Sequence, residues 1–280
     1  MDANFLRKQV NSSGFPFQVR IAHEILKTAN AHKWELLTEE HRWQVAEREG
    51  FADLVVWKEM RSILTFRSIS MVLILECKRV REGAWVFLAP AIDHPIPNRG
   101  FLTGSSLYPP AWWRITWYHR GDQTDEGPAA AYCAVPGQSD RGTPMLERIA
   151  SQLLQATESI GAQHQERLAT RSPQQPNVPA LFFPIVVTNA SLLLADFPVE
   201  AISLHAGDLP DAETTFTKQP FVRFQKSFTT LPVGEKKETR LDSANYQDQR
   251  TIWIVQASYL ARFLEGWALN VDDTLPDNIF

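Results

Sequence analysis

Three charged residues at the ends of two short apolar segments have the types and spacing to do chemistry together. Asp53 lies within the segment 51–57, and a second apolar segment ends in Glu76, Cys77 and Lys78. Residues two apart in a strand point to the same face, so Glu76 and Lys78 share one face and Cys77 points to the other. If the two segments pair as strands, Asp53 reaches the same place.

Two carboxylates and one ammonium in this position predict a cation site. Burying three ionisable groups is costly unless they are paired or bind a metal. Oxygen ligands from Asp53 and Glu76 suit Mg²⁺, with Mn²⁺ as a substitute, and Mg²⁺ commonly shares its ligands with a phosphate. Lys78 would hold the attacking water or stabilise developing negative charge. The residues therefore predict metal-assisted phosphodiester hydrolysis, and a salt bridge between strands is the alternative interpretation.

The pattern acid-x-Lys is a weak signal by itself, because the chain contains it twice. The second copy, at 235–237, lies in a polar loop with no apolar segment before it. Only the copy at 76–78 has both a preceding strand and an upstream acid, so we place the site there.

Helical periodicity over 17–31 predicts a helix that precedes these strands. Glu24 falls on a stripe of this helix together with Phe17, Ile21 and Thr28. That stripe is expected to face inward, where an unpaired carboxylate is costly. We therefore predict that Glu24 assists the site, and a solvated or capping carboxylate is the alternative.

The remaining periodic segments complete a mixed α/β pattern. Further strands are expected at 34–38, 181–188, 192–197 and 252–255. A long helix should follow Thr143 and Pro144, which form an N-cap and N1 pair. Ser258 should cap a last helix whose apolar face ends at Trp267. The fold class is therefore α/β, with a mixed central sheet flanked by helices.

A Pro-rich and Trp-rich segment interrupts this pattern. We expect one domain over 1–280, with its core at 15–88 and 144–268 and an insertion at 90–143. A flexible tail should follow at 269–280. The insertion carries an aromatic cluster, and long irregular segments in compact domains are often functional.

Composition excludes several classes of protein. With 44% hydrophobic residues and a mean hydropathy of −0.24, most of the chain should fold. No apolar run approaches the roughly 20 residues of a membrane-spanning helix, and the N-terminus has no signal-peptide pattern. Two cysteines make no disulfide framework. We therefore expect a cytoplasmic protein with no membrane partner.

Charge is unevenly distributed along the chain. The net charge is −4, yet the first 81 residues hold 13 Lys and Arg against 10 Asp and Glu. A polyanion site is therefore expected in the first third, although one protomer can neutralise few phosphates. We predict that a homodimer or a partner protein supplies further basic surface, with the insertion as the contact.

These residues resemble the PD-(D/E)xK nuclease superfamily, which has the restriction-endonuclease-like fold. The likeness rests on Phe51-Ala52-Asp53-Leu54 for the first acid and on Leu75-Glu76-Cys77-Lys78-Arg79 for the ExK element. Ala52 stands where the family commonly has proline. The segment from Gly14, with Glu24, looks like the first helix of that fold.

The resemblance implies a Mg²⁺-dependent nuclease that acts on DNA rather than RNA. Lys78, Asp53, Glu76 and Glu24 would be catalytic, Asp53 and Glu76 would bind the metal, and Arg79 and Arg81 would contact phosphates. Stand-alone members are often restriction, repair or phage-defence components. The alternative is an inactive nuclease-fold module that binds nucleic acid or a partner protein without cutting.

Overall fold

A computed structural model describes most of the chain, including both strands of the expected site. The described residues are 2–45, 47–61, 68–81, 83–90, 115–119, 128–136, 144–169, 180–227 and 249–271. The helices are α1 (Ala3–Ser13), α2 (Phe15–His32), α3 (Met145–Ala169) and α4 (Leu260–Glu265), with 3-10 turns at Val199–Ala201 and Ala257–Tyr259.

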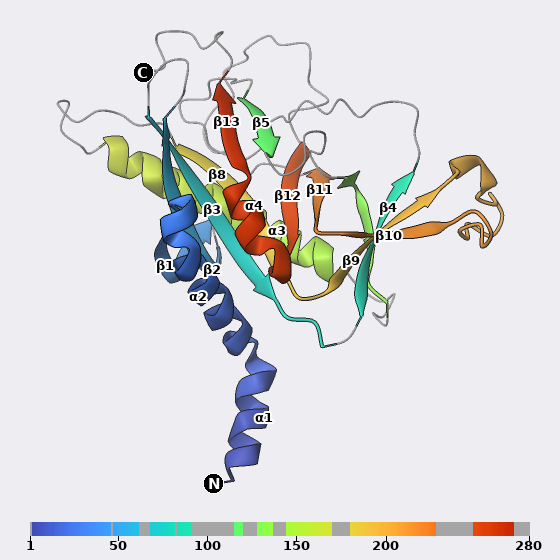
Figure 1. Ribbon diagram of the computed structural model, residues 1–280, viewed down its shortest axis with the longest axis horizontal. Coiled ribbons are helices and arrows are strands. Elements are labelled where there is room, and N and C mark those ends of the chain that lie inside the picture. Colours follow the sequence, from blue (N-terminus) through green and yellow to red (C-terminus); the bar gives the residue numbers. More distant parts are fainter. Residues whose placement is uncertain are drawn as a thin grey trace.

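The main sheet has seven strands in the order β1-β2-β3-β8-β12-β11-β6 (Figure 1). They are β1 (Glu35–Val45), β2 (Arg48–Arg61), β3 (Ser68–Lys78), β8 (Ala180–Thr188), β12 (Gln249–Gln256), β11 (Phe221–Ser227) and β6 (Ala129–Ala130). The first three strands pair antiparallel, whereas β3, β8 and β12 run parallel to one another. The sheet is therefore mixed, as the sequence predicts.

Two smaller sheets extend the molecule. One has the order β10-β9-β4-β7, and the other pairs β13 with β5. Their strands are β10 (Thr215–Gln219), β9 (Ser191–Phe197), β4 (Ala84–Pro90), β7 (Tyr132–Ala134), β13 (Trp267–Val271) and β5 (Ile115–His119). Because β4 follows β3 and β9 follows β8, the four-stranded sheet continues the parallel pair of the main sheet.

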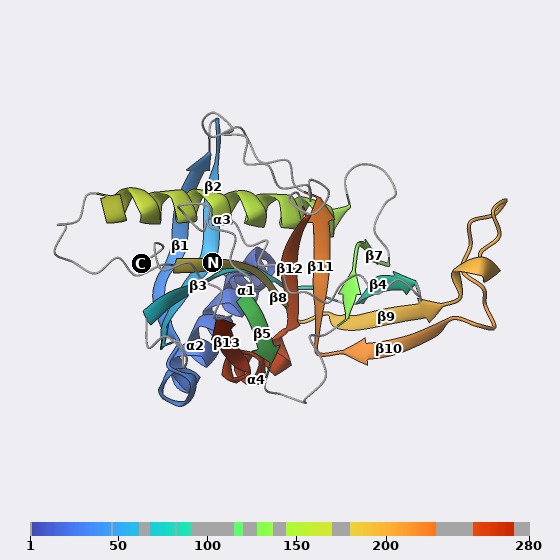
Figure 2. The same ribbon diagram turned by 90° about the horizontal axis from the view of Figure 1, so that it is seen from above.

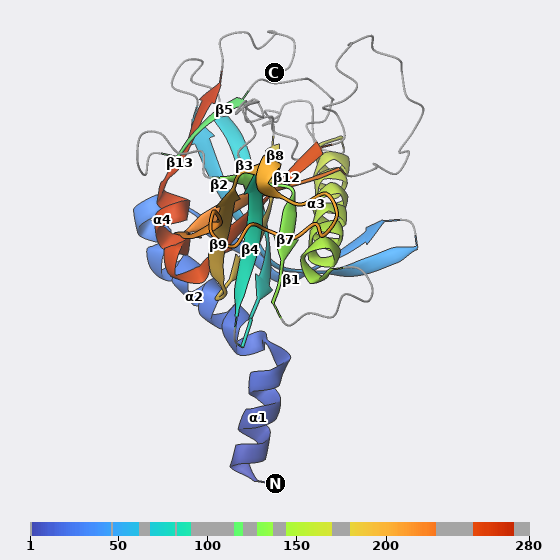
Figure 3. The ribbon, with the colours of Figure 1, turned by 90° about the vertical axis from the view of Figure 1, so that its right-hand side faces the viewer.

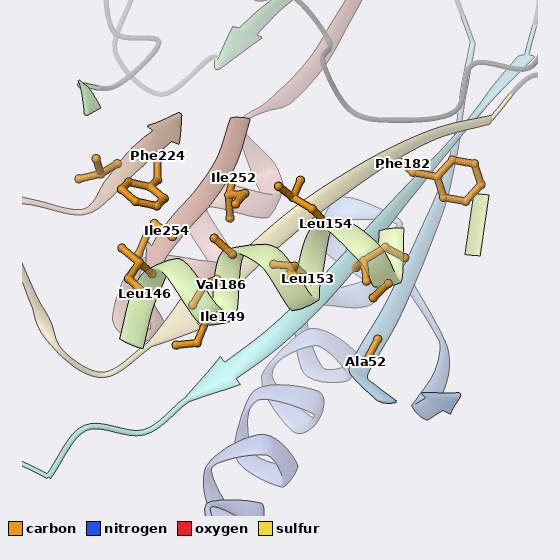
Figure 4. Packing of buried hydrophobic residues seen from close by; sticks show 14 of the residues in the cluster. Ala52, Leu146, Ile149, Leu153, Leu154, Phe182, Val186, Phe224, Ile252 and Ile254 are labelled. Carbon is orange, nitrogen blue, oxygen red and sulfur yellow. The ribbon is translucent and has the colours of Figure 1, made fainter. Parts of the chain in front are cut away.

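Helices cover both faces of the main sheet, with α3 on one side and α2 and α4 on the other (Figure 2). Leu54, Leu73 and Leu75 belong to the core beneath α2 and α4. On the other face, Ile74, Val186 and Ile254 pack against α3. Figure 4 shows this second core, with apolar side chains of α3 lying over those of β8 and β12.

The N-terminal helix α1 projects from this body (Figures 1 and 3). All of its residues are exposed, and Asp2 caps it by accepting a hydrogen bond from the Asn4 amide at 3.0 Å. Gly14, at φ 86°, ends α1 and begins α2, a backbone conformation that glycine adopts without steric cost. Among the described residues, no helix is long and apolar enough to cross a membrane.

The structure confirms most of the expected elements and changes one. The helix at 17–31 and the strands at 51–57 and 69–75 are present, each somewhat longer than expected. The last helix differs, because Tyr259 precedes its first residue and no side chain caps it, while Trp267 begins β13. The described part of the expected insertion 90–143 is not separate from the sheets, because β6 joins the main sheet and β7 pairs with β4. Most of the insertion and of the tail 269–280 lies outside the described residues, as do Trp112 and Trp113.

Candidate active site

The candidate site forms where β2 and β3 separate. Their antiparallel pairing ends at Leu54 opposite Leu75, whereas β3 continues beside β8 as far as Lys78. Beyond Leu54, the Cys77 amide no longer pairs with the backbone of β2 and instead donates a hydrogen bond to the Asp53 carboxylate at 2.6 Å. The first acid is thereby bound to the middle of the Glu76-Cys77-Lys78 triplet.

Alternation along β3 places Glu76 and Lys78 together, as predicted. The Lys78 ammonium lies 2.5 Å from a carboxylate oxygen of Glu76. The side chains are 34% and 15% exposed respectively, so the pair is largely shielded from water. Cys77 points the other way and packs against the core beneath α2.

Asp53 occupies an unfavourable electrostatic environment for a carboxylate. Its pKa is raised from 3.8 to about 7, chiefly by burial and next by the negative charge of Glu76. Glu40 raises this pKa further, while the Cys77 amide and the Lys78 ammonium act in the opposite direction. The single ammonium is therefore insufficient to balance the acids, and the site favours an additional positive charge.

A break in the regularity of β1 and β2 shapes this environment. Glu40 has φ 52°, a left-handed conformation that is uncommon outside glycine. It lies opposite Asp53, between the paired positions His41–Ala52 and Glu39–Leu54. Ala52 and Leu54 pack into opposite cores, although residues two apart in a regular strand share a face. The irregularity thus lies at the candidate site, where strained backbone is often functional.

Gln18 of α2 holds this irregular segment in place. Its side-chain amide donates to a carboxylate oxygen of Glu40 at 2.7 Å and to the Asp53 carbonyl at 3.2 Å. Gln18 is only 7% exposed. One buried amide therefore links α2 to Glu40 and to the backbone of Asp53, and neither Gln18 nor Glu40 was among the residues predicted from the sequence.

The end of β3 is fixed from the neighbouring strand. The side chain of Asn189, just after β8, donates to the Val80 carbonyl at 2.8 Å and accepts from the Val80 amide at 2.6 Å. These two bonds resemble a continued strand pairing two residues beyond Lys78. The backbone that carries Glu76 and Lys78 is consequently held on both sides of the pair.

The other predicted site residues lie elsewhere. Glu24 forms an ion pair with Arg20 at 2.5 Å, and it lies six residues beyond Gln18, or about 9 Å along the helix axis. The Arg79 guanidinium donates to the Asn11 carbonyl of α1, so it holds the N-terminal helix. Arg81 is exposed. The structure therefore brings Gln18, rather than Glu24, to Asp53.

Asp53 and Glu76 are the residues suited to hold a cation. Within the described part of the chain, no group of three or more His, Cys, Asp or Glu side chains is arranged as a metal cage. Mg²⁺ does not need one, because one or two carboxylates, several waters and a substrate phosphate suffice. The raised pKa of Asp53 is the observation that fits such an ion, since a cation would relieve it.

Glu76 also borders an open groove of about 690 Å³. The groove lies between the turn that joins β1 to β2 and the N-terminal half of α3. A substrate in this groove would therefore lie against one of the two acids.

Comparisons with protein-family models, with curated proteins and with solved structures gave no match.

Proposed function

We propose that this protein is a metal-dependent nuclease with a restriction-endonuclease-like core, acting on DNA rather than RNA. The observation that carries the proposal is a second carboxylate, Asp53, held beside the Glu76–Lys78 pair, with a pKa raised first by burial and next by Glu76. A groove that borders Glu76 gives a substrate access to one of these carboxylates. Two acids and a lysine beside an open groove suit the hydrolysis of a phosphodiester.

Asp53 and Glu76 would hold Mg²⁺ or Mn²⁺, because carboxylate oxygens are preferred ligands of these ions. When bound, the ion would lower the pKa of a water molecule and neutralise charge on the phosphate. The Cys77 amide fixes the Asp53 carboxylate at 2.6 Å, so its oxygens are already oriented.

Lys78 would act on the phosphate and on the attacking water. Its ammonium is held 2.5 Å from Glu76, where it donates hydrogen bonds and carries positive charge. It would orient the water and stabilise the negative charge that develops as the water oxygen bonds to phosphorus. The attacking water gives up one proton, the bond from phosphorus to the leaving oxygen breaks, and the leaving oxygen takes up one proton.

The test is cleavage by the purified chain. Labelled plasmid, linear duplex, single-stranded DNA and RNA are incubated with Mg²⁺, Mn²⁺ or EDTA, and the products are separated by size. We expect cleavage with either metal, none in EDTA, and none with Asp53→Asn. Binding without metal-dependent cleavage of any of these substrates would instead favour a nuclease-fold module that does not cut.

The state of assembly belongs to the same proposal. A homodimer or a partner protein would add the basic surface that one acidic chain lacks, and a two-fold dimer would present two sites to the two strands of a duplex. Light scattering across a dilution series tests this. A monomer that cuts both strands efficiently at physiological salt, with no partner, would contradict it.

A further inference from the structure

The groove beside Glu76 has two walls of different character. One wall is the turn region 47–51 with Trp43 behind it, and the other is the face of α3 between Glu147 and Ala156. Gly50 lies against the Trp43 indole so closely that an added Cβ would come within 2.8 Å of the ring. The glycine thus lets the indole pack flat against the turn, and Trp43 is only 5% exposed.

Phe51 is the aromatic side chain in this groove that faces water. It is 57% exposed, although it lies two residues before the half-buried Asp53. Other aromatic side chains, such as Phe15 and Phe216, are as exposed as Phe51, so its place in the groove rather than its exposure sets it apart. Phe51 offers a flat apolar surface beside the candidate site.

Most acidic side chains that line the groove are paired with a cation. Of its acids, Glu49 pairs with Arg42 at 2.6 Å and Glu147 pairs with Lys226. Glu76, as described above, pairs with Lys78, which leaves Glu47 as the acid without a cation among the described residues.

The two arginines of the groove contrast with these acids. Arg48 and Arg148 are both exposed, one on each wall. Neither has an ion-pair partner within the described ranges. Two such guanidinium groups facing one groove suit phosphates, which arginine binds in bidentate fashion.

We propose that this groove binds a short single-stranded stretch of nucleic acid, with a base stacked on Phe51 and phosphates on Arg48 and Arg148. The inference rests on the proposed function, which supplies nucleic acid as the class of substrate, and it adds that the bound strand is single. A volume of about 690 Å³ is that of a small-ligand pocket. A B-form duplex, whose major groove alone is about 12 Å wide, is too large to enter it. The site accordingly acts on single strands, frayed ends or flipped nucleotides.

Binding without cleavage tests the groove separately from the chemistry. Fluorescence anisotropy is measured in EDTA with a short labelled oligothymidylate and with a blunt duplex of the same length. The wild-type chain should bind the single strand more tightly than the duplex. Phe51→Ala should weaken single-strand binding roughly 5- to 100-fold, because one base stack is lost. Phe51→Trp should retain it.

The contribution of Arg48 and Arg148 can be measured separately, through the salt dependence of binding. The double variant Arg48→Ala with Arg148→Ala should weaken binding and lower the salt dependence of log Kd by about 0.7 for each phosphate contact removed. Phe216→Ala is the matched control, because Phe216 is 55% exposed on β10 of the other sheet. All substituted side chains are exposed, so thermal unfolding should confirm that each variant folds.

The outcomes separate the groove from the proposed function. If the wild type cuts nucleic acid but Phe51→Ala and the arginine variant bind the oligothymidylate as it does, the groove assignment is wrong and the nuclease stands. If these variants lose binding while the wild type cuts nothing, the groove stands and the nuclease does not. Equal affinity of the wild type for duplex and single strand would also overturn the groove proposal.

Discussion

Two carboxylate–cation pairs in this molecule have the same separation and different surroundings. On α2, Glu24 faces Arg20 at 2.5 Å, and the two charges balance. At the end of β3, Glu76 faces Lys78 at the same distance, but Asp53 adds a second carboxylate. The pKa of Asp53 is raised to about 7 first by burial and next by the negative charge of Glu76. A second, shielded carboxylate beside the pair therefore distinguishes the candidate cation site from the pair on α2.

The two ion pairs also differ in how far water reaches them. The Arg20 side chain is 64% exposed and that of Glu24 25%, so water reaches the helical pair chiefly through Arg20 and limits its contribution to roughly 0.3–0.5 kcal/mol. The Lys78 and Glu76 side chains are 34% and 15% exposed. Less water reaches them, and the electrostatic consequences of removing one member are larger.

Removing a member of the β3 site should have the largest effect. We expect Lys78→Ala and Asp53→Asn each to lower the rate of nucleic-acid cleavage by about 1,000-fold or more, because under the proposed function Lys78 would stabilise the reacting phosphate and Asp53 would hold the metal. Initial rates on a labelled substrate measure this.

Glu24→Gln is the matched control and should cut within about threefold of the wild type, a change of under 1 kcal/mol in the activation barrier. A loss of rate in Glu24→Gln equal to that of Asp53→Asn would mean that both pairs belong to the site. Wild-type rates in Asp53→Asn and Lys78→Ala would remove the assignment altogether.

The pH dependence of stability should also separate the two pairs. Because the pKa of Asp53 is raised on folding, the native state keeps a proton that the unfolded state releases between about pH 4 and about pH 7. This group therefore stabilises the fold at low pH, and its contribution is lost as the pH rises through that window. The expected loss in the free energy of unfolding is of the order of 2 to 4 kcal/mol without metal.

Urea unfolding in EDTA at a series of pH values measures that loss. The difference between wild type and Asp53→Asn should grow with pH in favour of the variant, and added Mg²⁺ should reduce it. A difference that stays constant between acid and neutral pH would show that Asp53 titrates normally.

Gln18 should have an intermediate effect, as a positioning residue. Gln18→Ala removes the hydrogen bonds to Glu40 and to the Asp53 carbonyl, and we expect a roughly 10- to 100-fold slower cleavage. Gln18→Glu instead adds a negative charge near Asp53, which should raise the pKa of Asp53 further. Because the ionised Asp53 carboxylate would bind the metal, cleavage should then require a higher pH. His23→Ala, on the exposed side of α2, is the control.

A merely structural role for Gln18 would give a different result. In that case Gln18→Ala would lower the melting temperature, while Gln18→Glu would leave the pH profile unchanged. The pH profile is therefore the deciding measurement.

The smallest effect is expected for the helical pair. Arg20→Ala should change the free energy of unfolding by no more than about 0.5 kcal/mol, because a pair one turn apart whose arginine is 64% exposed contributes little. Urea unfolding at neutral pH checks this. A loss of several kcal/mol would mean that this pair is not the balanced surface pair described above.

The sequence was sufficient to predict the core of the site because strand alternation is a local rule. Glu76 and Lys78 had to share a face, and Cys77 had to pack on the other, once 69–78 formed a buried strand. The pairing of β2 with β3 followed from two apolar segments close in sequence.

Gln18 and Glu40 could not be found in the same way. Glu40 reaches Asp53 through a left-handed residue in β1, and nothing in an exposed polar strand indicates that irregularity. Gln18 lies six residues before Glu24, and its neutral amide carries no charge that would indicate a site. One available sign was its position next to apolar residues of α2, since a buried amide requires partners.

Cation binding tests the central claim most directly. The Mn²⁺ ion gives an electron paramagnetic resonance signal in solution that is lost on binding, so a titration counts bound ions without any need for activity. We predict Mn²⁺ binding by the wild type that tightens as the pH rises through about 7, the pKa of Asp53. Asp53→Asn should abolish it, and Glu24→Gln should leave it unchanged. Equal Mn²⁺ binding by wild type and Asp53→Asn, or none by either, would contradict the account.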